Sequence, residues 1–363
     1  MVYLGSEVCK KGQTTGLSKG MKSMGYYENQ LKESEKIFYH AIVAGVTAFR
    51  KQIPAPAELS KEEINHCITA VFNDHPEIFY VNFHRIRYMS VQTERIYTPF
   101  YVHQKKEALQ YQERIEKKIQ EILEEAQKKN LVSIYQKCAW LHAYLIRNCV
   151  YDQEARESPD TIYKAYSIEG VLLDKKAVCR GIAATFKVLC GRMGVEAIIV
   201  KGRSLQPGSK DYARHAWNLV YGGKEAAQID VTWDMNLTEE GKPIRYDYFF
   251  LPDIEMMRDH QYVGYPICRQ LQSTYFERTG TLFKEFTDLE QYVRNILVEN
   301  GDMHQKGMYQ LYFKLRNKNS NVETIRAFVE GVIRQSTMQA YQYTVYYNER
   351  QLVFFYKIEF LES

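Results

Sequence analysis

The sequence has few features that would place the chain in a membrane, on nucleic acid or in an oxidising compartment. No uninterrupted apolar run is long enough to cross a bilayer, and the first twenty residues carry no secretory pattern of a basic segment and an apolar run. The 48 basic and 44 acidic residues leave a net charge of only +4, too weak for a phosphate-neutralising surface. The seven cysteines form no CxxC pair, and an odd number cannot all pair within one chain. We therefore expect a cytoplasmic protein in a reducing compartment, with neither a membrane nor a nucleic-acid partner.

Glycine-rich phosphate-binding loops, internal repeats and low-complexity tracts are also missing. What is present is ordinary: 363 residues, of which 45% are hydrophobic and 25% charged, a composition typical of globular proteins. At this length two or three packed units are expected. Helical and strand patterns alternate in blocks, which predicts an α+β protein with an N-terminal α/β extension over 1–103 that has a disordered start, a core over 104–268 and a C-terminal α+β subdomain over 269–363.

Local patterns predict the main elements. Ser60 and Glu63 have the spacing of a capping box, so a helix should begin there after two prolines. The other segments follow from apolar periodicity. Helices are expected over 28–52, 60–72, 104–130, 132–150, 286–298 and 322–334, and strands over 77–83, 84–91, 196–204, 308–315, 340–347 and 351–360.

One segment combines a helix with a nucleophile. The apolar side chains from Ile182 to Met193 form one helical face that ends before Gly194. Cys179 falls in the first turn of this helix, where unpaired N–H groups and partial positive charge stabilise a thiolate. Arg180 places a full positive charge next to it. Cys190 lies in the apolar stripe and is expected to be an inert packing residue.

Downstream, the run RHAWNLVYGGKEAAQIDVTWD is typical of a β-hairpin. If Gly222-Gly223 forms a two-residue turn, His215 lies directly opposite Asp230, and Trp217 lies opposite Gln228. Facing residues in an antiparallel pair have Cβ atoms about 4.5–5.5 Å apart, close enough for a carboxylate to orient an imidazole. A helix-terminal cysteine, a histidine and an aspartate are the parts of a thiol nucleophile, its base and the group that orients the base.

The motifs AVCRGIAATFK, HAWNLV and QIDVTWD, in this order, resemble the transglutaminase-like superfamily. Flanking segments resemble its bacterial members, so the resemblance covers approximately residues 131–260. It implies a papain-like core in which a helix bearing Cys179 packs on an antiparallel sheet bearing His215 and Asp230. It further implies Cys179 as the nucleophile, His215 as general base and acid, and Asp230 as the orienting group. Arg180 departs from the polar or acidic residue often found at that position in relatives, which would affect substrate preference or the thiol pKa.

Several other residues have two interpretations each. Trp217 and Trp233 could line the acyl groove, although packing within the hairpin is the default. Asp234 could form a turn or assist catalysis. The backbone N–H of Cys179 is one oxyanion donor, and Tyr166 or Ser167 is a guess for the second. His142 is expected to be a histidine at the edge of the core. The spacing of potential ligands does not resemble a zinc site, so neither a metal nor another cofactor is expected.

These residues predict an acyl-transfer enzyme. The Cys179 thiolate would attack a peptide or protein amide, and the resulting thioester would be resolved by water or by an amine. Because an amine wins only where an acceptor site excludes water, and no such site or calcium-binding pattern is recognisable, we favour hydrolysis by a cysteine peptidase or amidase. The alternatives are a protein-glutamine transglutaminase and a non-catalytic module that binds a peptide or a partner. The oligomeric state is not indicated.

Overall fold

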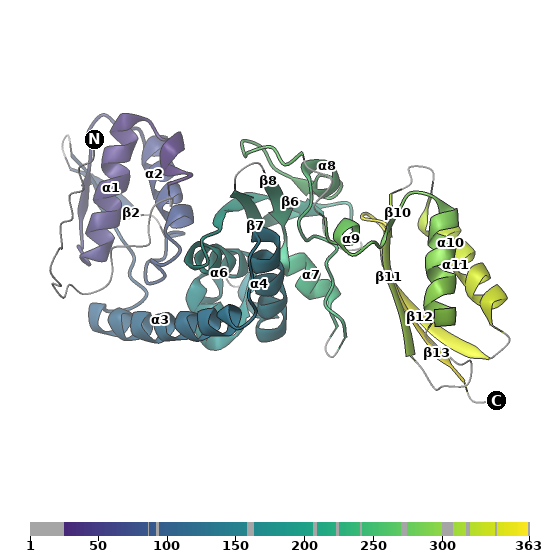
Figure 1. Cartoon of the computed structure of the whole chain (residues 1–363). Coiled ribbons are helices and arrows are strands. Elements are labelled where there is room, and N and C mark those ends of the chain that lie inside the picture. Colours follow the sequence, from purple (N-terminus) through teal and green to yellow (C-terminus); the bar gives the residue numbers. More distant parts are fainter. Residues whose placement is uncertain are drawn as a thin grey trace, which may run out of the picture.

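The computed structural model describes most of the chain between residues 25 and 361. The described residues are 25–85, 87–91, 94–157, 163–205, 209–222, 225–239, 242–269, 274–299, 308–316, 320–337 and 340–361. N-terminal, central and C-terminal elements follow one another in a row, and the long helix α3 (Lys105–Gln127) connects the first two groups (Figure 1).

The N-terminal group consists of two helices and a small sheet. Ser60 begins helix α2 through the predicted capping box: its Oγ accepts a hydrogen bond from the Glu63 N–H at 3.1 Å, and its own N–H donates to the Glu63 carboxylate at 2.9 Å. The prediction of a strand over 77–83 is wrong, because Ile78 to Phe83 are buried together instead of alternating and form only an isolated bridge at Val81. The elements are η1 (Glu28–Gln30), α1 (Glu33–Thr47), β1 (Ile53–Ala55), α2 (Lys61–Asp74), β2 (Arg87–Val91) and β3 (Glu94–Thr98), with sheet order β1-β3-β2.

The central group places helices against one face of a four-stranded sheet of order β8-β7-β6-β9. The predicted helix after residue 178 is confirmed and begins at Cys179 itself. The elements before the sheet are α4 (Ile134–Asn148), β4 (Val150–Tyr151), α5 (Gln153–Glu157), η2 (Tyr163–Tyr166), η3 (Gly170–Asp174), β5 (Lys176–Ala177) and α6 (Cys179–Arg192). The sheet and its connections contain β6 (Glu196–Leu205), β7 (Tyr212–Gly222), β8 (Glu225–Ile229), α7 (Val231–Leu237), α8 (Asp253–Met256) and β9 (His260–Gln261).

The predicted hairpin register is wrong by two residues. Gly222 pairs with Glu225 and Leu219 with Gln228, so the predicted pair of Trp217 with Gln228 does not form. The predicted turn residue Gly223 lies outside the described residues. Because side chains alternate with a period of two, a shift of two leaves every side chain on the predicted face of the sheet.

Asp230 is also placed differently from the prediction. Strand β8 ends at Ile229, and Asp230 is the N-cap of helix α7, where its Oδ1 accepts a hydrogen bond from the Trp233 N–H at 3.0 Å. The aspartate is therefore fixed by a helix terminus and not by a strand pair. Its backbone N–H donates to the Tyr248 carbonyl at 2.9 Å, which holds the strand-to-helix junction in place.

The central sheet is covered on both faces. Alternate residues such as Ile199 and Val220 pack with α6 in a large core cluster that also includes the N-terminal helices. The residues between them, such as Val200 and Leu219, pack against Tyr248 and Leu251 in a second cluster. The site at the end of this sheet is therefore held by rigid layers on two sides.

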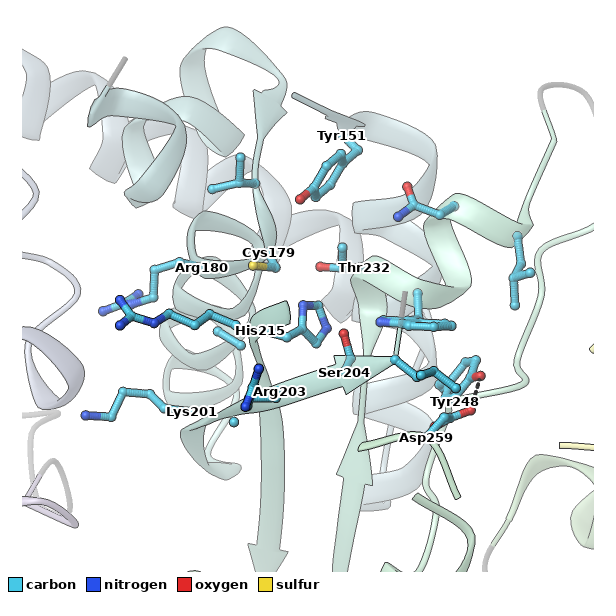
Figure 2. A pocket seen from close by; sticks show the side chains of 18 of the residues that line it. Tyr151, Cys179, Arg180, Lys201, Arg203, Ser204, His215, Thr232, Tyr248 and Asp259 are labelled. Carbon is cyan, nitrogen blue, oxygen red and sulfur yellow. Dashed lines mark hydrogen bonds between the residues drawn. The ribbon is translucent and has the colours of Figure 1, made fainter. Parts of the chain in front are cut away.

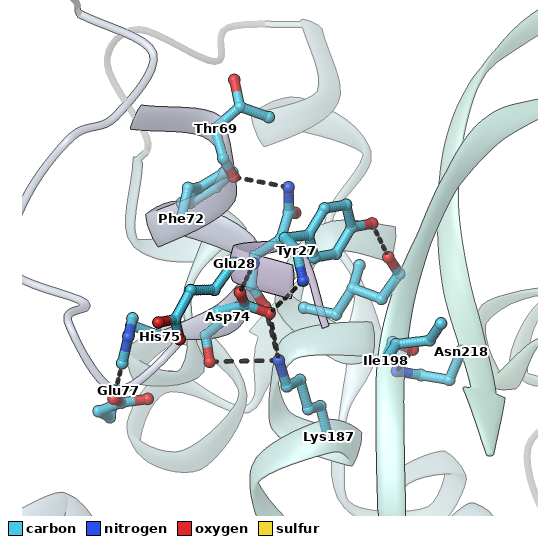
Figure 3. A network of polar contacts seen from close by, with 12 residues as sticks. Tyr27, Glu28, Thr69, Phe72, Asp74, His75, Glu77, Lys187, Ile198 and Asn218 are labelled. Atoms are coloured by element: carbon cyan, nitrogen blue, oxygen red, sulfur yellow. Dashed lines mark hydrogen bonds and ion pairs between the residues drawn. The ribbon is translucent and has the colours of Figure 1, made fainter. Parts of the chain in front are cut away.

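The N-terminal group is attached to helix α6 by a buried polar network (Figure 3). The Asp74 carboxylate accepts the backbone N–H groups of Tyr27 at 3.2 Å and Glu28 at 2.9 Å. Lys187 of α6 donates to the carbonyl of Asn73 at 2.8 Å and lies 3.7 Å from the Asp74 carboxylate. A cation at the C-terminal end of α2 is favourable because the helix carbonyls there carry partial negative charge.

The C-terminal group has its own core cluster around Phe313, Ile325 and Tyr356, with sheet order β10-β11-β13-β12. The helices and strands predicted from residue 286 onward are confirmed to within a few residues. Its elements are α9 (Tyr275–Arg278), β10 (Leu282–Phe283), α10 (Phe286–Glu299), β11 (Met308–Leu315), α11 (Val322–Ser336), β12 (Tyr341–Asn348) and β13 (Val353–Phe360).

The observed elements confirm an α+β fold. The boundaries after residues 103 and 268 stay predictions, although the N-terminal helices share their core with the central group. The start that was predicted to be disordered lies outside the described residues. Among the described residues, none of the helices combines the length and apolarity needed to span a membrane.

Candidate active site

Cys179, His215 and Asp230 come together where helix α6, strand β7 and helix α7 meet. His215 Nε2 lies 2.6 Å from Asp230 Oδ2. The imidazole also lies beside Cys179 (Figure 2), and the Cys179 thiol forms a hydrogen bond with the His215 side chain. The N–H of Ala216 adds a second hydrogen bond to the sulfur. The arrangement is a continuous line from sulfur to imidazole to carboxylate.

The charge of each group in this line shifts the pKa of its neighbour toward the ionised form. Burial by itself would raise the pKa of the Cys179 thiol, but the charge of His215 and the two hydrogen bonds outweigh burial and lower it. Burial would lower the pKa of His215, yet Asp230 and the Cys179 thiolate raise it to about 10. Burial opposes ionisation of Asp230 as well, and the neighbouring His215 nevertheless lowers the pKa of that carboxyl. The electrostatics therefore favour the thiolate of Cys179 and the imidazolium of His215 over their neutral forms.

A second histidine lies behind Asp230 and was missed by sequence reasoning. His260 Nε2 lies 3.1 Å from Asp230 Oδ2, and its Nδ1 lies 2.6 Å from Asp259 Oδ1. The Tyr248 hydroxyl donates to the other oxygen of Asp259 at 2.6 Å. All four groups are buried. The only signal in the sequence is the adjacent pair Asp259-His260, because a two-residue strand brings His260 across thirty residues to Asp230.

The two tryptophans of the hairpin occupy different places. Trp217 is 1% exposed, stacks on the His215 ring at 5.7 Å between centroids and donates to Gln228 Oε1 at 2.8 Å. It therefore supports the histidine from behind. Trp233 is partly exposed and lines the cavity beside Cys179, with its ring edge toward His215 at 6.5 Å.

Arg180 points away from the sulfur. Its Nη2 donates to the Phe72 carbonyl at 2.6 Å, and the guanidinium lies over the Phe72 ring at 4.0 Å. The lowered pKa of Cys179 comes from His215 and the hydrogen bonds described above. Arg180 thus attaches α6 to the C-terminal end of α2, as Lys187 does two turns further along the helix.

Ser167 and Tyr166, the two residues considered as a second oxyanion donor, lie in different surroundings. Ser167 is buried away from the cavity, and its hydroxyl donates to the Lys164 carbonyl at 2.9 Å. Tyr166 lines the cavity, but its hydroxyl donates to the Ala155 carbonyl at 3.1 Å. Figure 2 instead shows the hydroxyls of Tyr151 and Thr232 directed toward the Cys179 sulfur. Neither residue was singled out from the sequence.

Asp234 does not line the cavity. It is fully buried, and its Oδ2 lies 2.9 Å from His142 Nε2. Burial lowers the pKa of His142 to about 3, and burial together with the charge of Asp247 raises the pKa of Asp234. The contact is therefore a buried polar link between α4 and α7.

His215, Asp230 and His260 are the described side chains that could together hold a metal ion, since one ligand atom of each lies within 4.8 Å of the others. However, both Nε2 atoms are directed at the same Asp230 Oδ2, at 2.6 and 3.1 Å. A metal needs three lone pairs aimed at one common point. The hydrogen-bonded line accounts for these contacts better than a metal centre.

The sulfur opens onto a cavity of about 1630 Å³, larger than a typical small-molecule pocket. All three parts of the chain line it. Phe72 and His84 come from the N-terminal group, whereas Asn348 ends strand β12 and Arg350 lies in the turn that follows it. The space beside Cys179 could accommodate an extended chain.

Residues 120–231 match the family model of the transglutaminase-like superfamily, so this segment is a transglutaminase-like domain. Two solved structures are similar to parts of the chain. A TGase has 18% identity and a TM-score of 0.29, covering 50% of this chain and 51% of that one. A candidate cysteine protease from Cytophaga hutchinsonii has 14% identity and a TM-score of 0.26, covering 41% and 61%. The matched parts are thus less than two thirds of both proteins. A search of curated proteins finds no match.

Proposed function

We propose that the chain is a thiol-dependent enzyme that cleaves peptide or protein amides through Cys179, His215 and Asp230. The observation that supports this most strongly is the line from the Cys179 sulfur through His215 to Asp230, with a lowered thiol pKa and a raised imidazole pKa. A packing cysteine would instead have a raised pKa, as Cys190 has through burial.

The reaction follows from these positions. The thiolate attacks the amide carbon. The oxyanion of the tetrahedral intermediate then accepts one hydrogen bond from the backbone N–H of Cys179 and one from the hydroxyl of Tyr151 or Thr232. The C–N bond breaks as the imidazolium of His215 gives its proton to the leaving amine. Water then attacks the thioester while His215 takes up a proton, and the carboxylic acid leaves with the thiolate restored.

Water is favoured over an amine as the second reactant. The cavity is wide and opens to solvent, whereas transamidation needs an acceptor site that keeps water from the thioester. A transglutaminase reaction uses the same thioester, so the two differ only in the group that resolves it.

The experiment is incubation of the protein with a peptide library, with and without a primary amine, followed by mass measurement. Hydrolysis gives shortened peptides whether or not the amine is present, and transamidation gives a mass increase equal to the amine less ammonia. The Cys179→Ala variant should lose both products, by a factor of at least about a thousand in rate.

Cys190→Ala is the matched control, because this cysteine lies in the same helix but is buried in the core. It should retain turnover. Full activity of Cys179→Ala would disprove the proposed nucleophile. A wild-type protein that binds library peptides without converting them would identify the binding module instead.

A further inference from the structure

One wall of the active-site cavity carries a concentration of positive charge. Among the residues that the structure describes, six lysine or arginine side chains and two acidic side chains line the cavity, while the whole chain is nearly balanced in charge. Figure 2 shows Arg180, Lys201 and Arg203 toward one side of the Cys179 and His215 pair and Tyr248 and Asp259 toward the other. The remaining cations of the lining are Lys210, Arg214 and Arg350, which are exposed.

The sheet register places three of these cations on one face. Arg203 of β6 pairs directly with Arg214 of β7, and Lys201 lies two residues before Arg203. Directly opposed like charges destabilise an antiparallel pair, and neighbouring strands usually avoid them. The pair of Arg203 with Arg214 is next to the pair of Gly202 with His215 in this sheet, so the two arginines lie one position from the candidate catalytic histidine.

These charges have no carboxylate partners within the described part of the chain. Arg203 donates to the Tyr212 carbonyl at 2.7 Å, and Lys201 lies over the Tyr27 ring at 5.5 Å. Partial burial and the charge of Arg180 lower the pKa of Lys201, so the positive charges of Arg180 and Lys201 repel each other. By contrast, surface cations such as Lys118 and Arg192 have glutamate partners. A bound anion would relieve this repulsion.

We propose that Lys201, Arg203 and Arg214 bind acidic side chains of a peptide whose scissile amide lies at Cys179. This inference rests on the proposed function and adds a substrate class to it: peptides or protein segments rich in aspartate or glutamate. The peptide runs along the cavity, with its carbonyl at the sulfur and its carboxylates on the basic wall. Electrostatic attraction speeds its entry and orients it.

The test separates binding from turnover. Equilibrium binding is measured on the Cys179→Ala protein with three capped dodecapeptides, in which every second residue is Glu, Gln or Lys. The Glu peptide should bind at least about tenfold more tightly than the Gln peptide at low salt, and this ratio should shrink toward about threefold at high salt. The Lys peptide should bind most weakly.

The Arg203→Gln/Arg214→Gln double variant should remove most of the preference for Glu over Gln. Lys105→Gln/Lys106→Gln is the matched control, because it removes the same charge from exposed positions in α3 outside the cavity. It should keep the preference. If the double variant does not fold, Arg214→Gln alone serves, since within the described residues its side chain makes no hydrogen bond to the protein. A partial loss is then expected.

Equal binding of the Glu and Gln peptides would overturn the inference, as would an unchanged preference in the double variant. A single-stranded DNA dodecamer that bound the same cations more tightly than the Glu peptide would also overturn it. The two proposals fail separately. Glu-selective binding without turnover by the wild-type protein would contradict only the proposed function, and turnover without charge selectivity would contradict only this inference.

Discussion

At the scale of single residues, the candidate site is a chain of groups in which each fixes the next. His215 lowers the pKa of Cys179, Asp230 holds His215, and His260 contacts the same oxygen of Asp230 from behind. The Asp230 carboxylate contacts the ring nitrogens of two histidines and accepts a hydrogen bond from a backbone N–H, so it has little freedom to rotate. We therefore assign His260 as a positioning residue, which acts on the reaction only through Asp230.

The His260→Gln variant tests this assignment. Its amide can still fill the space, but it cannot contact both Asp230 and Asp259 as the imidazole does. We expect kcat on a cleaved peptide to fall by about tenfold while KM stays within about twofold, because substrate does not touch this residue. Steady-state kinetics measure the two constants, and thermal unfolding shows whether the fold is intact. A change in KM alone would contradict a positioning role.

At the scale of elements, a glycine in strand β6 leaves the space in which the Trp217 ring stacks on His215. A Cβ placed on Gly202 would lie 2.5 Å from the Trp217 ring and 2.4 Å from the Gln261 carbonyl, and neither distance is tolerated. Glycine is therefore required here by close approach of a ring and a neighbouring strand. The stacked Trp217 in turn fixes the plane of the imidazole.

Gly202→Ala should lower the free energy of unfolding by about 1–3 kcal/mol, because the ring or the strand must move. It should also slow alkylation of Cys179, since His215 loses its support. The control is Gly191→Ala in helix α6, where an added Cβ meets nothing within 4 Å. That change should be neutral or stabilising by about 0.5–1 kcal/mol. Chemical denaturation compares them, and equal effects would contradict the steric argument.

Helix termini were the elements that could be predicted best from sequence. The Ser60 cap and the position of Cys179 in the first turn of α6 depend on neighbours within a few residues, so local patterns suffice. The hairpin register was wrong because local sequence does not decide which residues form the turn: Gly222 belongs to the strand and pairs with Glu225, whereas the prediction placed Gly222 in the turn. His260 could not be predicted, since only the tertiary fold carries it to Asp230.

At the scale of the whole molecule, the C-terminal group is joined to the central group by a buried ion pair. The carboxylate of Glu255 in α8 forms two ion pairs: Oε2 lies 2.7 Å from Lys314 Nζ of β11, and Oε1 lies 2.7 Å from Arg316 Nη2. Gln351 donates to the Glu255 carbonyl at 3.1 Å. This junction positions the turn that carries Arg350 into the cavity, so the C-terminal group contributes directly to the lining.

Removing the carboxylate should be costly because it leaves the ammonium of Lys314 buried without a counter-charge. We expect Glu255→Gln to lower the free energy of unfolding by about 3–5 kcal/mol. Glu277→Gln removes a second, partly exposed partner of Arg316 and should cost at most about 1 kcal/mol. Urea denaturation measures both. Equal losses would show that the buried pair does not hold the junction.

The central claim is that His215 activates Cys179 as a thiolate, and the pH profile of iodoacetamide labelling tests it most directly. Peptide mapping follows each cysteine separately. Since the pKa of Cys179 is lowered and that of His215 is raised to about 10, labelling of Cys179 should have its midpoint well below the value of about 8.5 for a free thiol.

In His215→Gln the burial of the sulfur is no longer offset by a positive charge, so the midpoint should move above that of free cysteine. Cys190, buried in the core, should stay unlabelled in both proteins. A low midpoint in the wild type that rises in His215→Gln is the result that this account predicts. A wild-type midpoint at or above that of free cysteine would contradict it.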